Sequence, residues 1–159
     1  MSKYLIIDAN LLLLLVIGSV GNGELIKKSN RLSKYKYEDF ILIKLIMEEY
    51  KGYGIEYGIS QYIATEVSNL IDIKDETGKE NTFLSAKLFF SSFTQIDSII
   101  KNDVSYNKFT KFGITDSFLC NSIKDNFILT HDTRLSPLLA SIKYENLIDF
   151  TIIREGVST

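Results

Sequence analysis

The sequence predicts a single α/β domain with a mostly parallel central sheet. Apolar stretches of strand length alternate with stretches of helical periodicity along the chain, which is the pattern of an α/β fold. The first of these stretches, Tyr4–Ile7, is continuously apolar, as is typical of a parallel strand covered on both faces. No repeat and no Pro- or Ser-rich linker divides the 159 residues, a length that suits one domain with a sizeable core. We therefore expect one domain over residues 1–159.

The opening segment combines a strand that ends at Asp8 with a buried helix over about 11–17. Glycines then predict a break, the first of them at Gly18. The apolar run of this segment could be mistaken for a membrane span, but it contains Asp8 and Asn10. An Asp at the centre of a spanning helix costs about 2.5–3.5 kcal/mol, and the run is also short. We expect no membrane anchor here.

The remaining elements are predicted from apolar spacing, polar caps and glycine breaks. In chain order we expect a helix over 38–51, a strand over 55–59, a helix over 61–71 capped by Ser60, a polar loop over 72–81, a helix over 82–93, an ambiguous region over 95–112, a helix opened by residues 113–116, a strand over 126–130, a short helix over 134–142 and a last strand near 147–153.

Composition limits the class of protein. With 45% hydrophobic residues the chain is far from the disordered range. The net charge of −2 provides no global attraction for nucleic acid, so any polyanion must be held by a local patch or a bound metal. Cys120 is the single cysteine and cannot form an internal disulfide, which favours a reducing, cytoplasmic location.

Four acidic residues stand at or near the ends of predicted elements: Asp8, Glu66, Asp116 and Asp132. Three of them have an ordinary structural interpretation. Asp8 and Asp132 could cap the helices that follow them, and Asp116 could favour the positive end of its own helix.

Glu66 is expected on or beside the apolar face of its helix, where a carboxylate needs a partner. Lys and Arg are absent from residues 4–26, 57–73 and 112–123. Acids that meet without a counter-ion repel one another, and a divalent cation resolves this conflict. Oxygen ligands with little His or Cys suit Mg²⁺ or Mn²⁺ rather than zinc. The residues alone therefore predict an acidic metal pocket.

The order of these motifs resembles that of PIN-domain nucleases, a family that includes the toxin ribonucleases of toxin–antitoxin systems. The resemblance covers nearly the whole chain and depends on four short segments around the acids: Ile-Asp8-Ala-Asn10-Leu-Leu, Thr65-Glu66-Val67-Ser68-Asn69-Leu70, Gly113-Ile-Thr115-Asp116 and Leu129-Thr130-His131-Asp132-Thr-Arg-Leu135. It implies a three-layer α/β/α domain in which Asp8, Glu66, Asp116 and Asp132 bind Mg²⁺ or Mn²⁺ and catalyse hydrolysis of a phosphodiester, most often in RNA.

The resemblance also suggests roles for neighbouring polar residues. Thr130, two residues before the last acid, would orient an acid or contact phosphate, and Asn10 would have a lesser role at the substrate. His131 departs from the family pattern and is interpreted as a residue of the strand end rather than a ligand. The chain between the first strand and Glu66 is longer than in compact members of the family.

That longer segment contains the one basic cluster of the sequence, which we consider for substrate binding. Its members are Lys27, Lys28, Arg31, Lys34 and Lys36, with Tyr35 and Tyr37 for stacking on bases. A solvated surface loop is an equally good interpretation of this cluster.

The expected partners are RNA as substrate, an antitoxin protein and a second copy of the chain in a homodimer. The aromatic residues 83, 89, 90 and 93 could form core or a dimer face, and the helix over 38–51 is a second candidate interface. The competing function is a PIN-like protein-binding or scaffold module with little or no catalysis. A phosphatase of the haloacid dehalogenase type is disfavoured because Asn10 stands where a second Asp is normally found.

Overall fold

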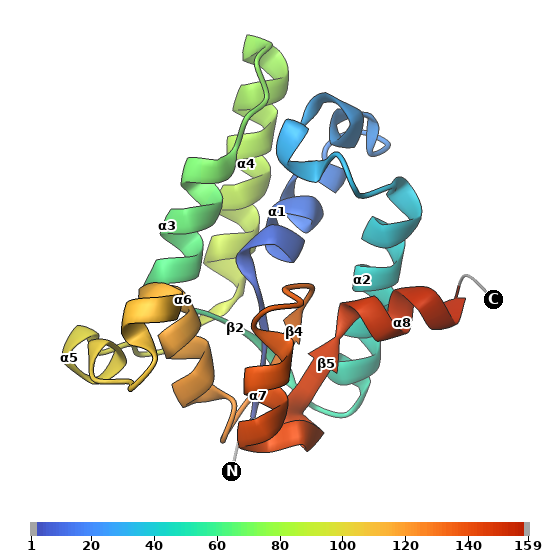
Figure 1. The fold of residues 1–159 in the computed structure, drawn as a ribbon. Coiled ribbons are helices and arrows are strands. Elements are labelled where there is room, and N and C mark those ends of the chain that lie inside the picture. Colours follow the sequence, from blue (N-terminus) through green and yellow to red (C-terminus); the bar gives the residue numbers. More distant parts are fainter. Residues whose placement is uncertain (1–2, 158–159) are drawn as a thin grey trace.

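The computed structural model describes residues 3–157, which form one parallel sheet with helices around it (Figure 1). The strand order is β3-β2-β1-β4-β5, and every neighbouring pair is parallel. The strands are β1 (Tyr4–Ile7), β2 (Glu56–Ile59), β3 (Thr94–Gln95), β4 (Phe127–Thr130) and β5 (Leu147–Asp149). The predicted α/β class with a three-layer arrangement is confirmed.

Helices cover both faces of this sheet. From β1 the chain adds β2 and then β3 on one side, and it then crosses back to add β4 and β5 on the other side of β1. Because the crossovers are right-handed, this reversal places the earlier and the later helices on opposite faces of the sheet. On one face lie α1 (Ala9–Gly18), α2 (Tyr37–Gly52) and α4 (Glu76–Ser92), and on the other α5 (Ile100–Val104), α6 (Phe109–Ser122) and α7 (Ser136–Lys143) (Figure 1). The α3 helix (Gln61–Leu70) contacts both α1 and α6.

Shorter elements complete the chain. Two 3₁₀ helices, η1 (Glu24–Lys28) and η2 (Asn30–Leu32), join α1 to α2, and η3 (Tyr144–Asn146) precedes β5. The α8 helix (Phe150–Val157) follows β5, and Arg154 forms an ion pair of 3.0 Å with Asp39 at the start of α2.

The α1 helix is the centre of the core. Each residue over 11–17 is apolar and at most 1% exposed, because α2, α3 and α4 all pack against this helix. A helix that is hydrophobic on all sides is stable only when it is surrounded in this way. No helix within residues 3–157 is both long enough and apolar enough to span a bilayer.

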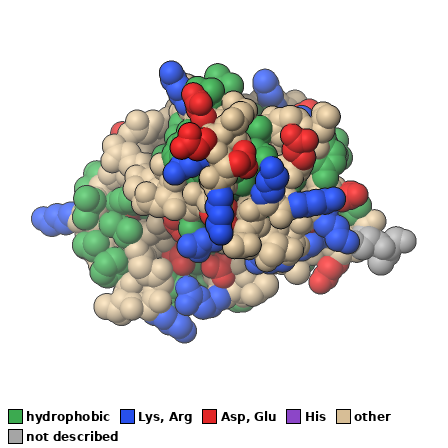
Figure 2. Space-filling view, turned by 90° about the horizontal axis from the view of Figure 1, so that it is seen from above, with side chains coloured by type: hydrophobic (Ala, Val, Ile, Leu, Met, Phe, Trp, Pro, Cys, Tyr) green, Lys and Arg blue, Asp and Glu red, His purple; other side chains and the backbone are tan. Residues whose placement is uncertain are grey.

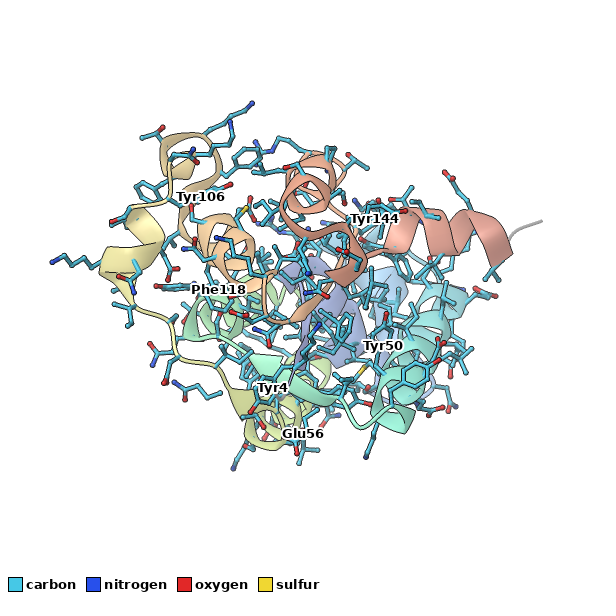
Figure 3. All side chains as sticks on the ribbon, turned by 90° about the horizontal axis from the view of Figure 1, so that it is seen from below. Tyr4, Tyr50, Glu56, Tyr106, Phe118 and Tyr144 are labelled. Carbon is cyan, nitrogen blue, oxygen red and sulfur yellow. The ribbon has the colours of Figure 1, made fainter. Side chains whose placement is uncertain are left out.

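Figure 3 views the molecule from the end at which the strands begin. Tyr4 and Glu56 lie side by side there, as expected from their pairing in the register of β1 with β2 (Figure 3). Tyr50 of α2 packs on Phe127 of β4 with ring centroids 5.1 Å apart, and Phe118 of α6 lies on the other side of the sheet (Figure 3). Aromatic rings thus fill the space between the sheet and both helical layers.

Two predicted elements are wrong in part. The loop expected over 72–81 is largely helical, because Asp75 caps α4 by accepting a hydrogen bond of 2.8 Å from the Gly78 amide. Its polar composition hid the helix, since most of this first part faces solvent. The last strand ends at Asp149, and the remaining residues form α8, which begins with the fully buried Phe150. The ambiguous region over 95–112 contains the end of β3, all of α5 and the start of α6.

Candidate active site

The four predicted acids lie around one cavity at the carboxyl ends of β1 and β4. These strands are neighbours, yet the chain leaves β1 toward one side of the sheet and enters β4 from the other. Such a reversal of strand order is where open α/β sheets form their ligand crevice. The cavity has a volume of about 740 Å³. Its walls include Asp8, Asn10, Tyr62, Glu66, Asn69, Phe112, Thr115, Asp116, Asp132 and Arg134. Figure 2 looks onto this end of the molecule, where acidic and basic side chains lie next to one another.

Asp8 is held in place by the register of the sheet. Its amide donates to the Leu129 carbonyl at 2.9 Å, which continues the pairing of β1 with β4 by one residue. Its Oδ1 accepts a hydrogen bond of 2.8 Å from the Ala9 amide, so Asp8 also caps α1. The capping interpretation of Asp8 is confirmed, and the same side chain lines the cavity, so its role as a site residue stays a prediction.

Thr130 fixes the other oxygen of Asp8. Its hydroxyl donates to Asp8 Oδ2 at 2.7 Å, and its side chain is fully buried. The prediction left open whether Thr130 orients an acid or contacts phosphate, and its buried hydroxyl on Asp8 favours the first role. The same hydroxyl oxygen accepts a hydrogen bond of 3.1 Å from the Asp132 amide, so one buried threonine links the acids that follow β1 and β4.

Asp132 organises the turn that leads into α7. Its Oδ1 accepts hydrogen bonds from the amides of Arg134, at 2.8 Å, and Leu135, at 3.1 Å. The turn interpretation of Asp132 is thus also correct in geometry, and the side chain still lines the cavity.

Glu66 lies beside the core face of α3, which is one of the two positions that the sequence allowed. Ile63 and Val67 form that face, whereas Glu66 is exposed on the adjoining side and lines the cavity. The periodicity could not separate these neighbouring faces, because they differ by a fraction of a turn. Thr115 of α6 lines the same cavity, and its side chain acts to lower the pKa of Glu66.

Asp116 reaches the cavity because α6 changes direction just before it. Gly113 has φ 83° and ψ −177°, a left-handed conformation that an L side chain rarely adopts, and the helix restarts beyond it. The Ser117 hydroxyl donates to the Gly113 carbonyl at 2.7 Å and steadies the new turn. The prediction that residues 113–116 open a helix is confirmed in this sense.

The cavity concentrates negative charge. Burial, followed by repulsion from Asp8 and Asp132, raises the pKa of Asp116 to about 7, with Arg134 acting in the opposite direction. Burial also raises the pKa of Asp8, although the hydrogen bonds from Thr130 and Ala9 oppose this effect. The pKa of Glu66 is raised by the partial burial of its carboxylate at the cavity wall and by the charge of Asp8.

Sequence reasoning missed Arg134, the one Lys or Arg side chain that lines the cavity within residues 3–157. Its Nη2 lies 3.9 Å from Asp116 Oδ2. The segments counted as free of Lys and Arg stopped short of the loop that carries Arg134, so the acids have one local cation. The position of Arg134, two residues after Asp132, was the feature of the sequence that could have identified it.

The other predicted site residues fall at the rim or outside the cavity. Asn10 is exposed and lines it. Lys27, Lys28 and Arg31 are not among its lining residues, and Lys28 forms an ion pair of 3.6 Å with Asp75. Their role in substrate binding stays a prediction.

Tyr35 is buried, His131 is half-buried, and the two side chains contact each other. Tyr35 is only 5% exposed, so it is not available to stack on a base, whereas Tyr37 is 45% exposed. His131 Nδ1 is hydrogen-bonded to the Tyr35 hydroxyl at 2.7 Å, and its ring packs on Phe150. The interpretation of His131 as a structural residue of the strand end agrees with these contacts.

The four acids fit Mg²⁺ or Mn²⁺ in charge and ligand chemistry. Within the described residues, no three His, Cys, Asp or Glu side chains lie close enough together to enclose an ion as they stand. Mg²⁺ does not need such a cage, because it usually keeps several waters and is held by one or two carboxylates. Hard oxygen donors and an excess of negative charge over the single Arg134 are the features that favour it here.

Comparisons of the chain with protein-family models, with curated proteins and with solved structures give no match.

Proposed function

We propose that this protein is a metal-dependent nuclease that hydrolyses RNA phosphodiester bonds. The observation that carries the proposal is the meeting of four acids from four separate segments at the point where the strand order reverses. Burial is the main cause of the raised pKa values of Asp8, Glu66 and Asp116, and the charge of a neighbouring acid adds to it in each case. A protein with no use for this charge gains nothing by collecting it. The resemblance of the four motifs to PIN-domain nucleases names the reaction and favours RNA as the substrate.

The chain's own residues would share the work as follows. Asp8 and Asp116 would be the principal metal ligands, and Glu66 and Asp132 would complete the site directly or through water. Thr130 keeps Asp8 oriented through its hydrogen bond. Asn10 offers an exposed amide at the cavity wall for a substrate contact. When bound, Mg²⁺ or Mn²⁺ supplies positive charge that lowers the pKa of an attacking water and stabilises the departing oxygen.

A protein partner is part of the proposal, because α4 presents apolar side chains to solvent. Leu84 is 52% exposed and Leu88 is 72% exposed, beside a largely apolar groove of about 540 Å³ that also involves Val20 and Phe89. Of the four aromatic residues considered for an interface, Phe93 is core and Phe83 is 38% exposed. A homodimer or an antitoxin would cover such a surface.

The α2 helix presents a second apolar stripe of this kind. Tyr37, Ile41 and Leu45 follow one another at four-residue spacing, and Leu45 is 56% exposed.

The free, buried Cys120 is compatible with a reducing cytoplasm, which is where we propose that the protein acts.

The test is cleavage of a mixed single-stranded RNA pool in Mn²⁺, in Mg²⁺ or in EDTA. Wild type is compared with Asp8→Asn and Asp116→Asn, and with Asp125→Asn as a control for an acid exposed outside the cavity. We expect metal-dependent cutting by wild type and the control, and its loss in both cavity variants. Equal cutting by all four proteins would mean that a contaminating nuclease is responsible and would remove the proposal.

The exposed stripes on α2 and α4 favour a second candidate, a protein-binding module with little or no catalysis. The two functions differ in their need for metal. Calorimetry with Mn²⁺ distinguishes them, because a folded wild-type protein that binds no metal and cuts no RNA would be assigned to the binding module.

A further inference from the structure

Arg134 is held between two of the four acids. Its backbone amide donates to Asp132 Oδ1 at 2.8 Å, and its Nη2 lies 3.9 Å from Asp116 Oδ2. Its guanidinium carbon lies 5.0 Å from the centre of the Phe112 ring, which supports the flat face of the group. The backbone of this residue is therefore anchored, while its charged end rests on a wall of the cavity.

The guanidinium of Arg134 is held only weakly by Asp116. The Arg134 side chain is 61% exposed, whereas that of Asp116 is 16% exposed, so the ion pair stands at the mouth of the cavity. Exposed ion pairs of this length contribute little to stability. A divalent cation carries twice the charge of a guanidinium and competes for the same Asp116 oxygen. Arg134 would then lose its partner while it remains tethered beside the site.

A released guanidinium in this position has one obvious use in a nuclease. Its planar fork of N–H donors matches two oxygens of a phosphate, which makes arginine the preferred side chain for this contact. A second cation lies nearby, because Lys111 Nζ is 5.4 Å from the centre of the same Phe112 ring. The basic cluster near η1 is less suitable, since none of Lys27, Lys28 and Arg31 lines the cavity.

We propose that Arg134 is the substrate-phosphate contact of this site, and that its ion pair with Asp116 withholds it until a divalent cation occupies the acids. The inference rests on the proposed nuclease function. It adds an order of events, since metal binding prepares the cavity for the phosphate backbone. It also predicts that the metal and the nucleic acid increase each other's affinity through Arg134, because a coupling between two sites is reciprocal.

The test uses two binding measurements on the full chain and needs no catalysis. Mn²⁺ binding is measured by calorimetry. Binding of a short fluorescein-labelled single-stranded RNA is measured by anisotropy in Mn²⁺ and in EDTA, and a gel checks that the RNA stays intact. The variants are Arg134→Gln and the control Lys124→Gln, which removes an exposed positive charge outside both the cavity and the basic cluster.

For Arg134→Gln we expect Mn²⁺ to bind about two- to fivefold more tightly, because a competing cation has been removed. We expect RNA to bind about tenfold more weakly in Mn²⁺. The slope of log K against log salt should become shallower by about 0.7, the value for one lost phosphate contact on a single strand. In EDTA the RNA affinity should change less than about twofold. Lys124→Gln should leave Mn²⁺ binding unchanged.

Three results would overturn the inference. Unchanged Mn²⁺ affinity in Arg134→Gln would show that the arginine does not compete with metal. An equal loss of RNA affinity in Mn²⁺ and in EDTA would show that the arginine is not withheld. If wild type binds no Mn²⁺ at all, the nuclease proposal fails and this inference fails with it. If wild type binds Mn²⁺ but the variant binds it no better, only the role of Arg134 is removed.

Discussion

The most direct consequence of the site is that Asp116 destabilises the metal-free protein at alkaline pH. Its pKa is raised to about 7 in the folded state, whereas an ordinary aspartate titrates near 3.8. The folded state therefore holds a proton that the unfolded chain releases, and the free energy of unfolding falls as the pH rises from about 4 to about 7. Above a pH of about 7 this loss of stability is complete.

The size of the effect follows from this difference in pKa. At about 1.4 kcal/mol per pKa unit the full difference corresponds to about 4 kcal/mol. Solvent at the mouth of the cavity screens the charges, so we expect about 1–2 kcal/mol. Asp116→Asn has nearly the same shape without the charge. In EDTA the Asp116→Asn substitution should raise the free energy of unfolding by about 1–2 kcal/mol at pH 8 and by much less at pH 5.

The measurement is urea unfolding followed by far-UV circular dichroism, with Asp125→Asn as the control for an exposed acid. Adding Mn²⁺ at about 100 times its Kd should reverse the order of stability, because wild type then gains about 2.7 kcal/mol and the variant gains less. A variant that is less stable than wild type at pH 8 in EDTA would refute the reasoning. An equal gain at both pH values would also refute it, since the charge of Asp116 would not be the cause.

Three further predictions concern the elements that hold the site. Thr130→Val should cost about 1–3 kcal/mol of stability and weaken Mn²⁺ binding, because it removes the hydrogen bond to Asp8; unchanged binding in calorimetry would contradict this. Gly113→Ala should cost about 1–3 kcal/mol through backbone strain alone, since no atom lies within 4 Å of the added methyl group. Gly52→Ala is the control, because its added methyl group also has no atom within 4 Å and Gly52 has no positive φ. Urea unfolding of the two variants separates backbone strain from packing, and equal losses of stability would exclude strain. Asp103→Ala should cost about 1–3 kcal/mol in the same assay, because this buried carboxylate joins α5 to α3 and α6 through hydrogen bonds of 2.8 Å and 3.1 Å. A cost well below about 1 kcal/mol would show that these bonds are dispensable.

The sequence by itself determined the fold class and most of the elements. The continuous apolar run that ends at Asp8 is compatible only with burial on both faces, and such local patterns reflect burial directly. The sequence missed the first part of α4, because its exposed residues carry no apolar period and its start depends on a single cap at Asp75. It also extended the last strand into α8, where apolar content alone does not distinguish strand from helix.

The sequence also singled out the four acids, but their surroundings were decided only by the tertiary structure. The register of β1 with β4 places the Thr130 hydroxyl on Asp8, and no local pattern specifies which residue of one strand lies opposite which residue of the other. The exposure of Glu66 and the ion pair of Arg134 with Asp116 likewise arise from the packing of α3 and α6 and from the turn after β4. Charges interact through space, so the balance of charge in a cavity becomes known only when distant segments are brought together.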